Sequence, residues 1–600
     1  MPMAIRKKFF RSNTTDPLEG SSSSYPTENG SAELTTHDPD FKGPTEDVVD
    51  QAASEEFPNE EAQEGVTHAE AVTLQWTKPS LICAYALMWS LYCVNAFQSS
   101  ITNNLSAYIT SGFEAHSLIP VIAIVSSIMG AATYMPLAKV LNLWDRSWGF
   151  LLMVCFAILG LILSATCTGI GTYCAAQVFY SIGFAGLIFC VDVITADTST
   201  LRDRGLAYAF TSSPYIISAY GGSAAAEKFY QSNWRWGYGC FAIVLPAVAA
   251  PMFLLLKYHL RKAKRAGLLK PKEKSGRTLQ QSIWYYVIEF DILGVFLLTA
   301  GLALFLLPFT IAGSTENDWK SASIIVMLVI GILCLIGFCV SERYFAPVPF
   351  LQWEMLSSRT VMGACLIDAT YQIAYYCWAD YFTSYLYVVF GTSIATAGYI
   401  SSIFDVVSGV WLFFVGFAIR RTRRFQWLLF IAVPVYLLGV GLMIYFRRPQ
   451  WSVGYTIMCQ VMIAFAGGTM IIVQQVAVLA AADHNNAASS LAFLNVFGNM
   501  GSAVGSSISG AVWTHTLPAA LKKYLPASAL PDWEAIYDDV DMQLSYPIGS
   551  ATRTGIINAY AEAQTRMLIA GTAIMATSLI WMVLMKDIKL TKSQTKGVLF

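Results

Sequence analysis

Charge is scarce in this 600-residue chain. Only 13% of its residues are Asp, Glu, Lys or Arg, and the net charge is −1, whereas soluble domains carry roughly a quarter charged residues. The near-zero balance excludes the strongly basic composition of nucleic-acid-binding proteins, so we expect no nucleic-acid partner. Hydrophobic residues make up 55% of the chain instead. These proportions are typical of a membrane protein.

Metal-binding and disulfide patterns are also missing. The 12 cysteines all lie in apolar segments, from Cys83 to Cys459, and form no CxxC pair. The six histidines are scattered, without the spacing of a zinc site. There is no GxxxxGK[ST] loop for a nucleotide. We therefore expect no resident metal, no cofactor and no enzymatic activity.

The chain instead contains fourteen apolar segments. A helix needs roughly 20 apolar residues to cross the hydrocarbon core of a bilayer. The segments therefore predict an all-α membrane protein with fourteen transmembrane helices. They are 80–98, 117–138, 147–167, 173–195, 206–226, 237–256, 291–312, 321–341, 360–381, 395–418, 426–446, 453–481, 488–513 and 567–585.

Positive charge predicts the orientation of these helices, because Lys and Arg concentrate on the cytoplasmic side. Nine Lys or Arg residues lie in 257–277, and four Arg residues lie in 420–424. Placing both clusters inside makes both termini cytoplasmic. Arg447 and Arg448 then fall outside and count against this orientation, but they are outnumbered.

Composition also predicts the divisions of the chain. Residues 1–75 hold 15 acidic and 5 basic residues and little to bury, which is typical of a disordered cytoplasmic tail. A regulatory tail and a merely solvated extension both fit. The remaining divisions are a six-helix half at 76–256, a basic cytoplasmic loop at 257–290, an eight-helix part at 291–585 with an extracellular loop at 514–566, and a cytoplasmic tail at 586–600.

Six plus eight spans resemble the layout of the larger major-facilitator transporters, in which two six-helix halves enclose a midplane substrate site. The two extra helices are expected to be the seventh and eighth. The superfamily signature Gly-x3-Asp-x2-Gly-Arg, between spans two and three, is reduced here to its Arg, Arg146.

More specific motifs follow along the chain. They resemble those of the fungal siderophore–iron transporters, over roughly residues 76–590, and within that family the importers of fusarinine-type siderophores. The motifs are DVITADTSTLRDRG at 192–205, NWRWG at 233–237, EFDILG at 289–294, LPFT at 307–310, YFTSYL at 381–386 and YPIGS at 546–550 with Arg553 and Tyr560.

This resemblance implies proton-coupled import of a ferric hydroxamate siderophore, with triacetylfusarinine C as the preferred candidate. It also implies a monomer in the plasma membrane, or in endosomal vesicles as well, with protons and the lipid bilayer as its other partners. Two rivals stay open: a fourteen-span drug–proton antiporter, and a non-transporting nutrient sensor of the same fold.

Carboxylates at membrane depth are costly and usually functional. Asp192, Asp368 and Asp405 lie within predicted spans, and Glu227 lies at the end of one. Each is a candidate proton carrier, because a desolvated carboxylate can load a proton on one side and release it on the other. The alternative is that each pairs with a buried polar group and only fixes the packing of helices.

Aromatic and amide side chains are the candidate substrate ligands. Tyr and Trp combine apolar contact with a hydrogen-bonding tip, which suits a bulky hydroxamate complex. Helix packing and an interfacial aromatic belt are the alternative interpretations. The candidates are Tyr371, Gln372, Tyr375 and Gln475 in the helices, and Tyr546 and Tyr560 in the outer loop, where they would help to capture the substrate.

Four charged residues are candidates for structural or gating roles. Arg146 stands in the superfamily signature, and Asp197 and Arg202 stand in the motif that follows span four. Arg553 is expected to pin the outer loop to an acidic partner. The acidic residues of that loop are not expected to bind iron, because the siderophore already fills the coordination shell of the ferric ion.

Overall fold

The computed structural model describes residues 63–113, 116–269, 278–314, 318–351, 353–482 and 486–590. Every regular element in these ranges is helical, as predicted. Residues 1–62 of the predicted tail and 591–600 of the predicted C-terminal tail lie outside the described residues. The prediction of a tail without structure up to residue 75 is wrong at its end, because residues Glu64–Leu74 form helix α2 and bury Val66 and Ala69.

The N-terminal half contains seven further α-helices. Pro214 separates α7 from α8, since proline lacks the N–H that a continuous helix would use at that point. The bounds are α3 (Lys78–Ser111), α4 (Ile119–Leu143), α5 (Arg146–Thr166), α6 (Ile170–Thr198), α7 (Arg204–Ser212), α8 (Pro214–Ser232) and α9 (Trp236–Arg265).

The rest of the described chain forms helices α10 to α24. Long helices alternate with short ones at the turns. The bounds are α10 (Leu279–Glu289), α11 (Ile292–Ile311), α12 (Ala322–Val340), α13 (Trp353–Ser357), α14 (Arg359–Ala379), α15 (Phe382–Phe390), α16 (Ile394–Ser401), α17 (Ile403–Thr422), α18 (Gln426–Phe446), α19 (Val453–Ala481), α20 (Ala487–Tyr524), α21 (Trp533–Asp538), α22 (Val540–Ser545), α23 (Ala551–Met575) and α24 (Ser578–Leu584).

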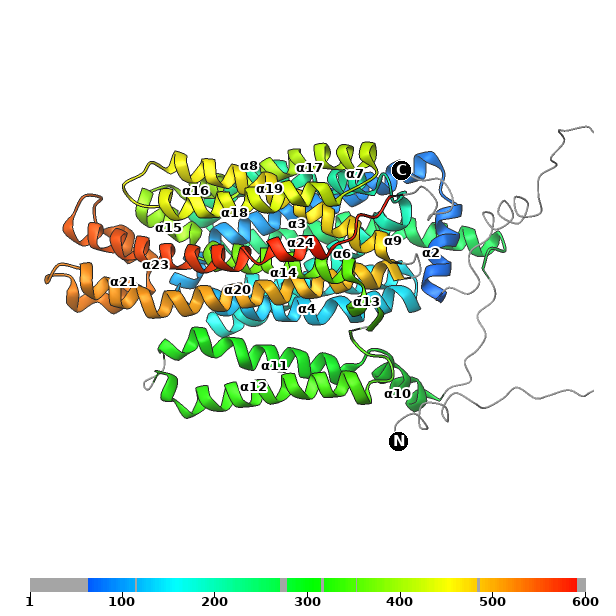
Figure 1. The fold of residues 1–600 in the computed structure, drawn as a ribbon, viewed down its shortest axis with the longest axis horizontal. Coiled ribbons are helices and arrows are strands. Elements are labelled where there is room, and N and C mark those ends of the chain that lie inside the picture. The colour runs from blue at the N-terminus through cyan, green and yellow to red at the C-terminus, as the bar shows by residue number, and fades with distance from the viewer. Residues whose placement is uncertain are drawn as a thin grey trace, which may run out of the picture. The chain divides into compact units, whose positions relative to one another are not determined.

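Eleven helical segments of the described chain are long and apolar enough to cross a membrane. They are α3, α4, α5, α6, α9, α11, α12, α16 with α17, α18, α19, and α23 with α24. Helices α8, α14 and α20 run among them but are less apolar (Figure 1). Small and polar residues lower the hydropathy of these three helices. Those residues pack against other helices.

Helices α11 and α12 form a hairpin at the side of the helical body. They pack on each other, and α11 also contacts α4 and α20. Figure 1 shows the pair along the lower edge of the view. These are the seventh and eighth predicted spans, which fits the expectation that they are additions to a twelve-helix core.

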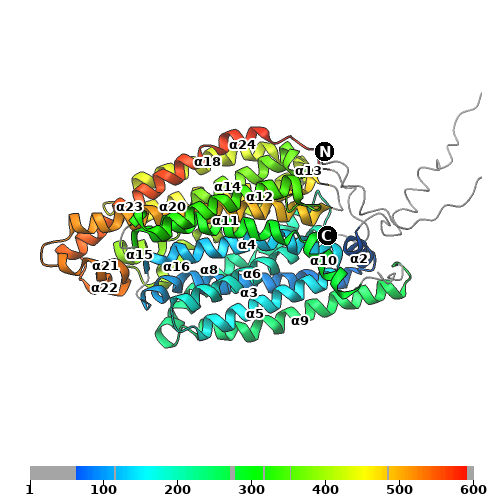
Figure 2. The ribbon, with the colours of Figure 1, turned by 90° about the horizontal axis from the view of Figure 1, so that it is seen from below.

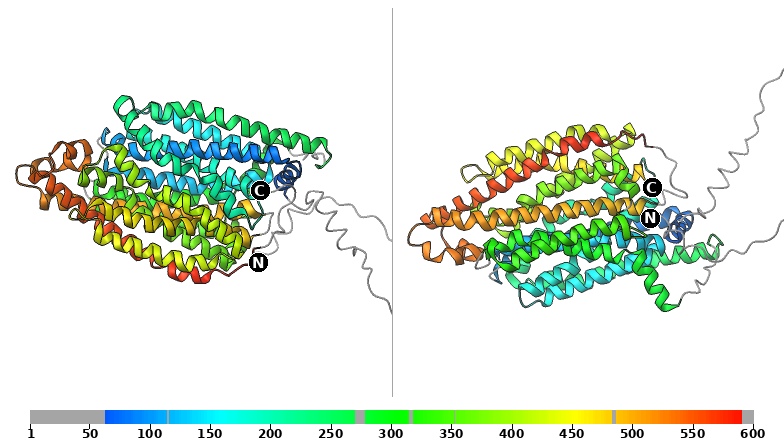
Figure 3. Two further views of the ribbon diagram at one scale, coloured as in Figure 1. Left: turned by 90° about the horizontal axis from the view of Figure 1, so that it is seen from above. Right: turned by 60° about the horizontal axis from the view of Figure 1, so that its bottom comes forward.

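The two ends of the helical body differ. Helix α2 lies at the end where α4, α9 and α17 finish, and Leu590 N donates to Arg423 O there over 3.0 Å. We call this the terminal end, because it holds α2, the first described helix, and Leu590, the last described residue. Helices α21 and α22 cover the opposite end, as Figures 2 and 3 show in orange.

Two predicted loops are wrong in their bounds. Helix α9 continues to Arg265 and α10 occupies 279–289, so most of the described part of 257–290 is helical. Helix α20 continues to Tyr524 and α23 begins at Ala551, so only 525–550 lies between them. The 38 residues of α20 span about 57 Å at 1.5 Å per residue. The fall in hydropathy therefore did not mark the end of the helix.

Arg447 is not an exposed loop charge. Its side chain is fully buried just after α18, and its guanidinium lies over the rings of Phe382 at 4.2 Å, Tyr385 at 4.8 Å and Trp378 at 5.1 Å. A charge held by aromatic rings inside the protein is not part of the loop bias that sets topology. Of the two arginines that counted against the predicted orientation, Arg447 therefore no longer does so.

Candidate functional site

A cavity of about 530 Å³ lies between the two halves, within the range of roughly 300–1,000 Å³ typical of small-molecule sites. Helices α3, α4, α6 and α8 supply one wall, and α14 to α17, α19 and α20 supply the other. Its lining is rich in amides, phenols and aromatic rings. These include Asn95, Asn103, Asn104, Gln177, Tyr180, Tyr215, Tyr375, Tyr376, Trp378, Phe382, Phe404, Gln460 and Asn499.

Two of the predicted residues meet in this cavity. Tyr375 of α14 and Asp405 of α17 both line it, and they lie close enough to interact electrostatically. Asp380, which follows α14, is a second carboxylate in the lining. No Lys, Arg or His is among the described lining residues. The charge that the wall itself brings to a ligand is therefore negative or zero, depending on protonation.

Asp192 faces a smaller neighbouring cavity of about 190 Å³. Tyr92 Oη donates to its Oδ1 over 2.5 Å. Asn95 and Tyr215 line both cavities, and Asn95 Nδ2 donates to Tyr215 Oη over 2.7 Å. The small cavity that Asp192 faces therefore shares Asn95 and Tyr215 with the wall of the main cavity.

Asp368 does not line either cavity. With the Gln474 amide oriented to face it, Gln474 Nε2 donates to Asp368 Oδ1 over 3.2 Å, and Asp368 N donates back to the amide oxygen over 3.2 Å. The carboxylate also packs on Gly498 of α20. This pairing is the structural arrangement that the sequence left open as the alternative to proton transfer.

Three candidate ligands of the helices line neither of the two cavities. Tyr371 is buried against Tyr375 and Tyr436, with ring centroids 6.4 and 5.4 Å apart. Gln372 and Gln475 are absent from the linings of both cavities. On α14, Tyr375 and Trp378 line the main cavity, while Tyr371 packs against a neighbouring helix, α18.

Glu227 supports the end of a helix. Its Oε2 accepts from the backbone N–H of Ala395 over 2.9 Å, in the first turn of α16. The first N–H groups of a helix have no partner inside the helix, and a carboxylate satisfies them well. Since α8 and α16 belong to different halves, this bond joins the halves at the opposite end.

The candidate residues of the predicted outer loop make hydrogen bonds and packing contacts within the protein. Tyr560 lies in α23 and is fully buried, and its Oη donates to Gln543 Oε1 over 2.6 Å. Tyr546 is half-buried and packs on the core. Arg553 is buried and donates to the carbonyls of Gln543 and Tyr387. The prediction that Arg553 pins the outer loop to an acidic partner is therefore wrong about the partner, because Arg553 donates to backbone carbonyls.

Of the predicted gating residues at the terminal end, Arg146 and Asp197 come together, whereas Arg202 contacts the other half. Arg146 Nε pairs with Asp197 Oδ2 at 3.1 Å, and its Nη1 donates to Asn142 Oδ1 over 3.3 Å. These contacts stay within one half. Arg202 Nε donates to Arg420 O over 3.2 Å, and Asp203 pairs with Arg420 at 2.9 Å. The second set joins the two halves.

The halves also meet at the opposite end. Tyr387 Oη donates to Asn104 O over 3.2 Å, and Tyr381 Oη donates to Ser117 O over 2.9 Å. From the segment that covers this end, Val540 N donates to Ser111 Oγ over 3.3 Å. The cavity therefore lies between two sets of contacts that link the halves.

Sequence reasoning missed most of the cavity. Its α3 wall carries Asn95, Ser99, Asn103, Ser106 and Thr110. These polar residues recur at intervals of three or four inside an apolar helix, so they share one face. That periodicity could have predicted a polar face of this helix from the sequence. No comparable pattern in the sequence marks Asn499 or Gln460 as cavity residues.

Comparison with known proteins identifies the family of the chain. The profile of the Major Facilitator Superfamily matches residues 88–506. MFS siderochrome iron transporter D of Aspergillus fumigatus is 71% identical over 597 residues, covering 99% of both chains. Siderophore iron transporter mirB of Emericella nidulans is 50% identical over 555 residues, covering 92% of both chains.

Solved structures share the fold at low sequence identity. A bacterial homologue of the human lysosomal transporter Spinster, inward-facing and occupied, matches with a TM-score of 0.52 and 13% identity, covering 85% of this chain and 97% of that one. The peptide transporter POT in complex with sulfate matches with a TM-score of 0.51 and 13% identity, covering 84% and 96%.

Proposed function

Because this chain belongs to the fungal siderophore–iron transporter family of the major facilitator superfamily, we propose that it imports ferric hydroxamate siderophores by alternating access. The observation that carries the proposal is the amide- and phenol-lined cavity between the halves. The iron travels as part of the substrate, inside its hydroxamate shell. Triacetylfusarinine C is the first complex to test.

The proposed topology has fourteen spans with both termini in the cytoplasm. The three spans beyond the eleven most apolar ones are α7 with α8, α14 and α20. At the terminal end, α9 finishes with Lys262, Lys264 and Arg265, and α17 with Arg420 and Arg421. Positive charge gathered at one end supports a cytoplasmic location for that end. We further propose that the protein is a monomer in the plasma membrane.

The lining suits a hydroxamate complex. Such a ligand presents amide-like oxygens and alkyl arms around a shielded ferric ion. Asn and Gln side chains and Tyr hydroxyls donate hydrogen bonds to such oxygens, while Trp378, Phe382 and Phe404 offer apolar contact. Tyr375 is the residue that we assign to direct ligand contact, since it was expected from the sequence and lines the cavity.

Transport requires the halves to separate at one end at a time. Separation at the terminal end breaks the Asp203–Arg420 ion pair and the bond from Arg202 to Arg420 O. Separation at the opposite end breaks bonds that include those from Tyr387 Oη to Asn104 O and from Ala395 N to Glu227 Oε2. Each set is small enough to be exchanged for the other during a rocking motion.

Proton symport is the proposed energy source. Asp405 lies in the cavity wall, where a ligand and a proton can influence each other directly. Asp192 faces the smaller cavity, which shares Asn95 and Tyr215 with the same wall. We assign the proton to these two carboxylates in preference to Asp368, which is paired with Gln474, and to Glu227, which caps α16.

The proposal is tested by uptake in yeast that lacks its own siderophore importers. Cells expressing the protein should accumulate radiolabelled ferric triacetylfusarinine C, and Tyr375→Phe should raise the apparent KM about three- to tenfold for one lost hydrogen bond. Tyr371→Phe is the matched control, because that tyrosine lies one turn away and outside the lining. If no ferric siderophore of a hydroxamate panel accumulates in cells with surface-localised protein, import is wrong.

A further inference from the structure

A histidine is buried where the two halves meet at the opposite end. His116 belongs to a single turn of 3₁₀ helix, His116–Leu118, between α3 and α4. Its side chain has no exposed surface, whereas histidine is usually only partly buried. It lines neither of the two cavities described above. The transport cavity therefore does not account for this residue.

The ring of His116 packs against aromatic rings of the other half. The ring centroids are 5.8 Å apart for Tyr381 and 6.3 Å apart for Trp513, and both contacts are edge-on. Tyr381 and Trp513 stack on each other at 3.8 Å. Tyr381 Oη also donates to the carbonyl of Ser117, the residue after the histidine, over 2.9 Å. His116 is therefore part of the contact that joins the halves at this end.

Neither nitrogen of the His116 ring has a hydrogen-bond partner among the described residues. The backbone of Ala107 acts on the ring without meeting the geometry of a hydrogen bond. Burying a neutral polar group without a partner costs about 1–3 kcal/mol, and burying an unpaired cation costs far more. The ring is therefore neutral while the halves are in contact here.

Carboxylates and phenols surround this contact. Asp380, between α14 and α15, and Asp538, at the end of α21, both act electrostatically on Tyr381. Tyr537 of α21 lies against Ser117. The neighbouring turns of α3 and α4 carry no charged side chain. Nearby carboxylates favour the protonated form of an imidazole, so they favour a charged His116 once water reaches the ring.

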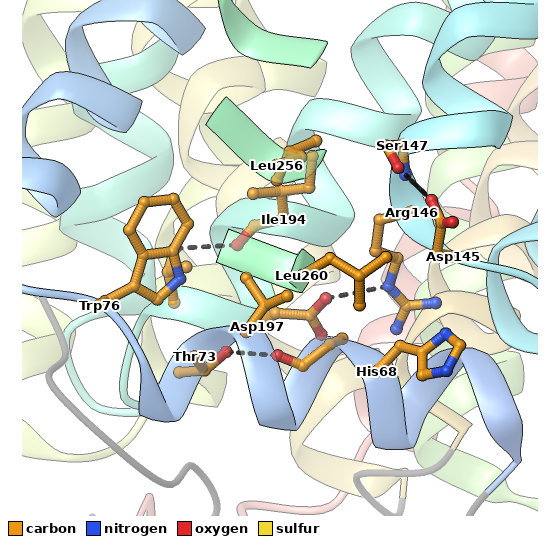
Figure 4. A pocket seen from close by; sticks show the side chains of 13 residues that line it. His68, Thr73, Trp76, Asp145, Arg146, Ser147, Ile194, Asp197, Leu256 and Leu260 are labelled. Atoms are coloured by element: carbon orange, nitrogen blue, oxygen red, sulfur yellow. Dashed lines mark hydrogen bonds and ion pairs between the residues drawn. The ribbon is translucent and has the colours of Figure 1, made fainter. Parts of the chain in front are cut away.

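A histidine at the terminal end is placed differently. His68 of α2 lines the same small pocket as Arg146 and Asp197 (Figure 4). Its Nε2 lies 4.0 Å from Glu64 Oε1, and α2 packs on α4, α6 and α9, which all belong to the N-terminal half. Protonating His68 therefore changes the charge within one half, whereas protonating His116 changes a contact between the halves.

We propose that His116 is a proton-binding site that couples acidity at the opposite end, the outer side in the proposed topology, to opening of that end. When the halves separate there, water reaches the ring, and a hydrated histidine takes up a proton at about pH 6.5. The charged ring cannot return to an apolar contact, so the proton holds this end open until it leaves. The inference rests on the alternating access proposed above and adds a proton site separate from Asp192 and Asp405.

The two states determine the sign and the size of this coupling. The open state binds the proton and the closed state excludes it, so the ratio of open to closed molecules rises as the pH falls. For one histidine that titrates at its usual value when open and not at all when closed, a fall from about pH 7 to about pH 5 raises that ratio by at most about 25-fold. An acidic exterior therefore favours the state that admits substrate.

The test is hydrogen exchange of the purified full-length protein in lipid nanodiscs, without substrate and without a pH gradient. His116→Phe keeps an aromatic ring in the contact but cannot bind a proton. For peptides from 104–112 and 381–390, the exchange rate of the wild type relative to this variant should rise by up to about 25-fold between about pH 7 and about pH 5. Comparing the two proteins at each pH removes the direct effect of pH on the exchange reaction.

Two further variants complete the test. His116→Gln keeps a polar side chain that does not titrate, so it should lose the pH response as well. His515→Gln is the matched control, because His515 is exposed at the same end and its Nε2 accepts from Trp319 Nε1 over 3.1 Å, which joins the α11–α12 hairpin to α20 and not the two halves. Loss of the response in both His116 variants, with its retention in His515→Gln, supports the proposal. Retention of the full response in either His116 variant overturns it. The readout involves no transport, so failure here is distinct from failure of the proposed function.

Discussion

At Gly416 the backbones of the two halves lie close together at the terminal end. A Cβ there would lie 3.0 Å from Gly205 C, 3.0 Å from Leu206 N and 3.1 Å from Gly205 O, all across the contact of α17 with α7. These are backbone atoms and cannot rotate away. Gly416→Ala should therefore favour the state in which the halves are apart at this end.

The size of the effect follows from the cost of overpacking. Added methyl groups in well-packed contacts cost about 1–3 kcal/mol, which corresponds to an equilibrium shift of about 5- to 150-fold. The higher helix propensity of alanine acts on both states alike and does not offset this shift. The expected result is a change of conformational population, with no loss of folded protein.

Hydrogen-exchange mass spectrometry measures this shift without a covalently attached probe. Peptides from 200–212 and 416–425 should exchange faster in Gly416→Ala than in the wild type. Gly205→Ala is the control at the same crossing, because its Cβ would meet only ordinary contacts at 3.5 Å or more. If the two variants exchange equally, or if Gly416→Ala exchanges like the wild type, the reasoning about this contact is refuted.

The remaining predictions address the opposite end, the proton and the outer cover. In Gly398→Ala the added Cβ would lie 2.4 Å from Ser223 Oγ and 2.7 Å from Asn104 Oδ1. Hydrogen exchange should therefore be faster in peptides of the opposite end. Faster hydrogen exchange at the terminal end would contradict this. Asp192→Asn should reach the membrane but lose concentrative uptake, because an amide of the same size carries no proton, and normal accumulation by a surface-localised variant would remove Asp192 from the mechanism. A protonophore should abolish initial uptake of the ferric siderophore, whereas uptake that survives it and stops on ATP depletion would exclude symport. Tyr560→Phe leaves the buried Gln543 Oε1 without its 2.6 Å donor and should cost about 1–3 kcal/mol of stability. The expected result is a lower Tm with little change in KM. A change in KM without a change in Tm would indicate that Tyr560 contacts the substrate.

The candidate site was predicted only in part, and Asp192 and Asp368 show why. Both are acidic residues inside apolar spans, and the sequence treats them alike. The fold places Asp192 beside Tyr92 in the wall of the smaller cavity, and places Asp368 opposite Gln474. The difference depends on which residue of another helix stands across from each carboxylate, and no local pattern contains that information.

Tyr371 and Tyr375 repeat this lesson on one helix. They are four residues apart, and their shared face was expected to contact ligand. Only Tyr375 lines the cavity, because the cavity covers just part of the length of α14 and Tyr371 packs on Tyr436 instead. Periodicity predicts a face of a helix but not the depth at which that face meets a ligand.

By itself the sequence determined that this protein lies in a membrane, that it is helical, and that it belongs to its family. Length and hydropathy decide membrane insertion because the bilayer requires each span to satisfy its own backbone hydrogen bonds. Only the tertiary structure decided that Arg447 is buried under three rings, that 514–524 and 551–566 are helical, and which polar groups form the cavity. The rotation and depth of each helix are set by packing against helices distant in the chain, and that packing places the site.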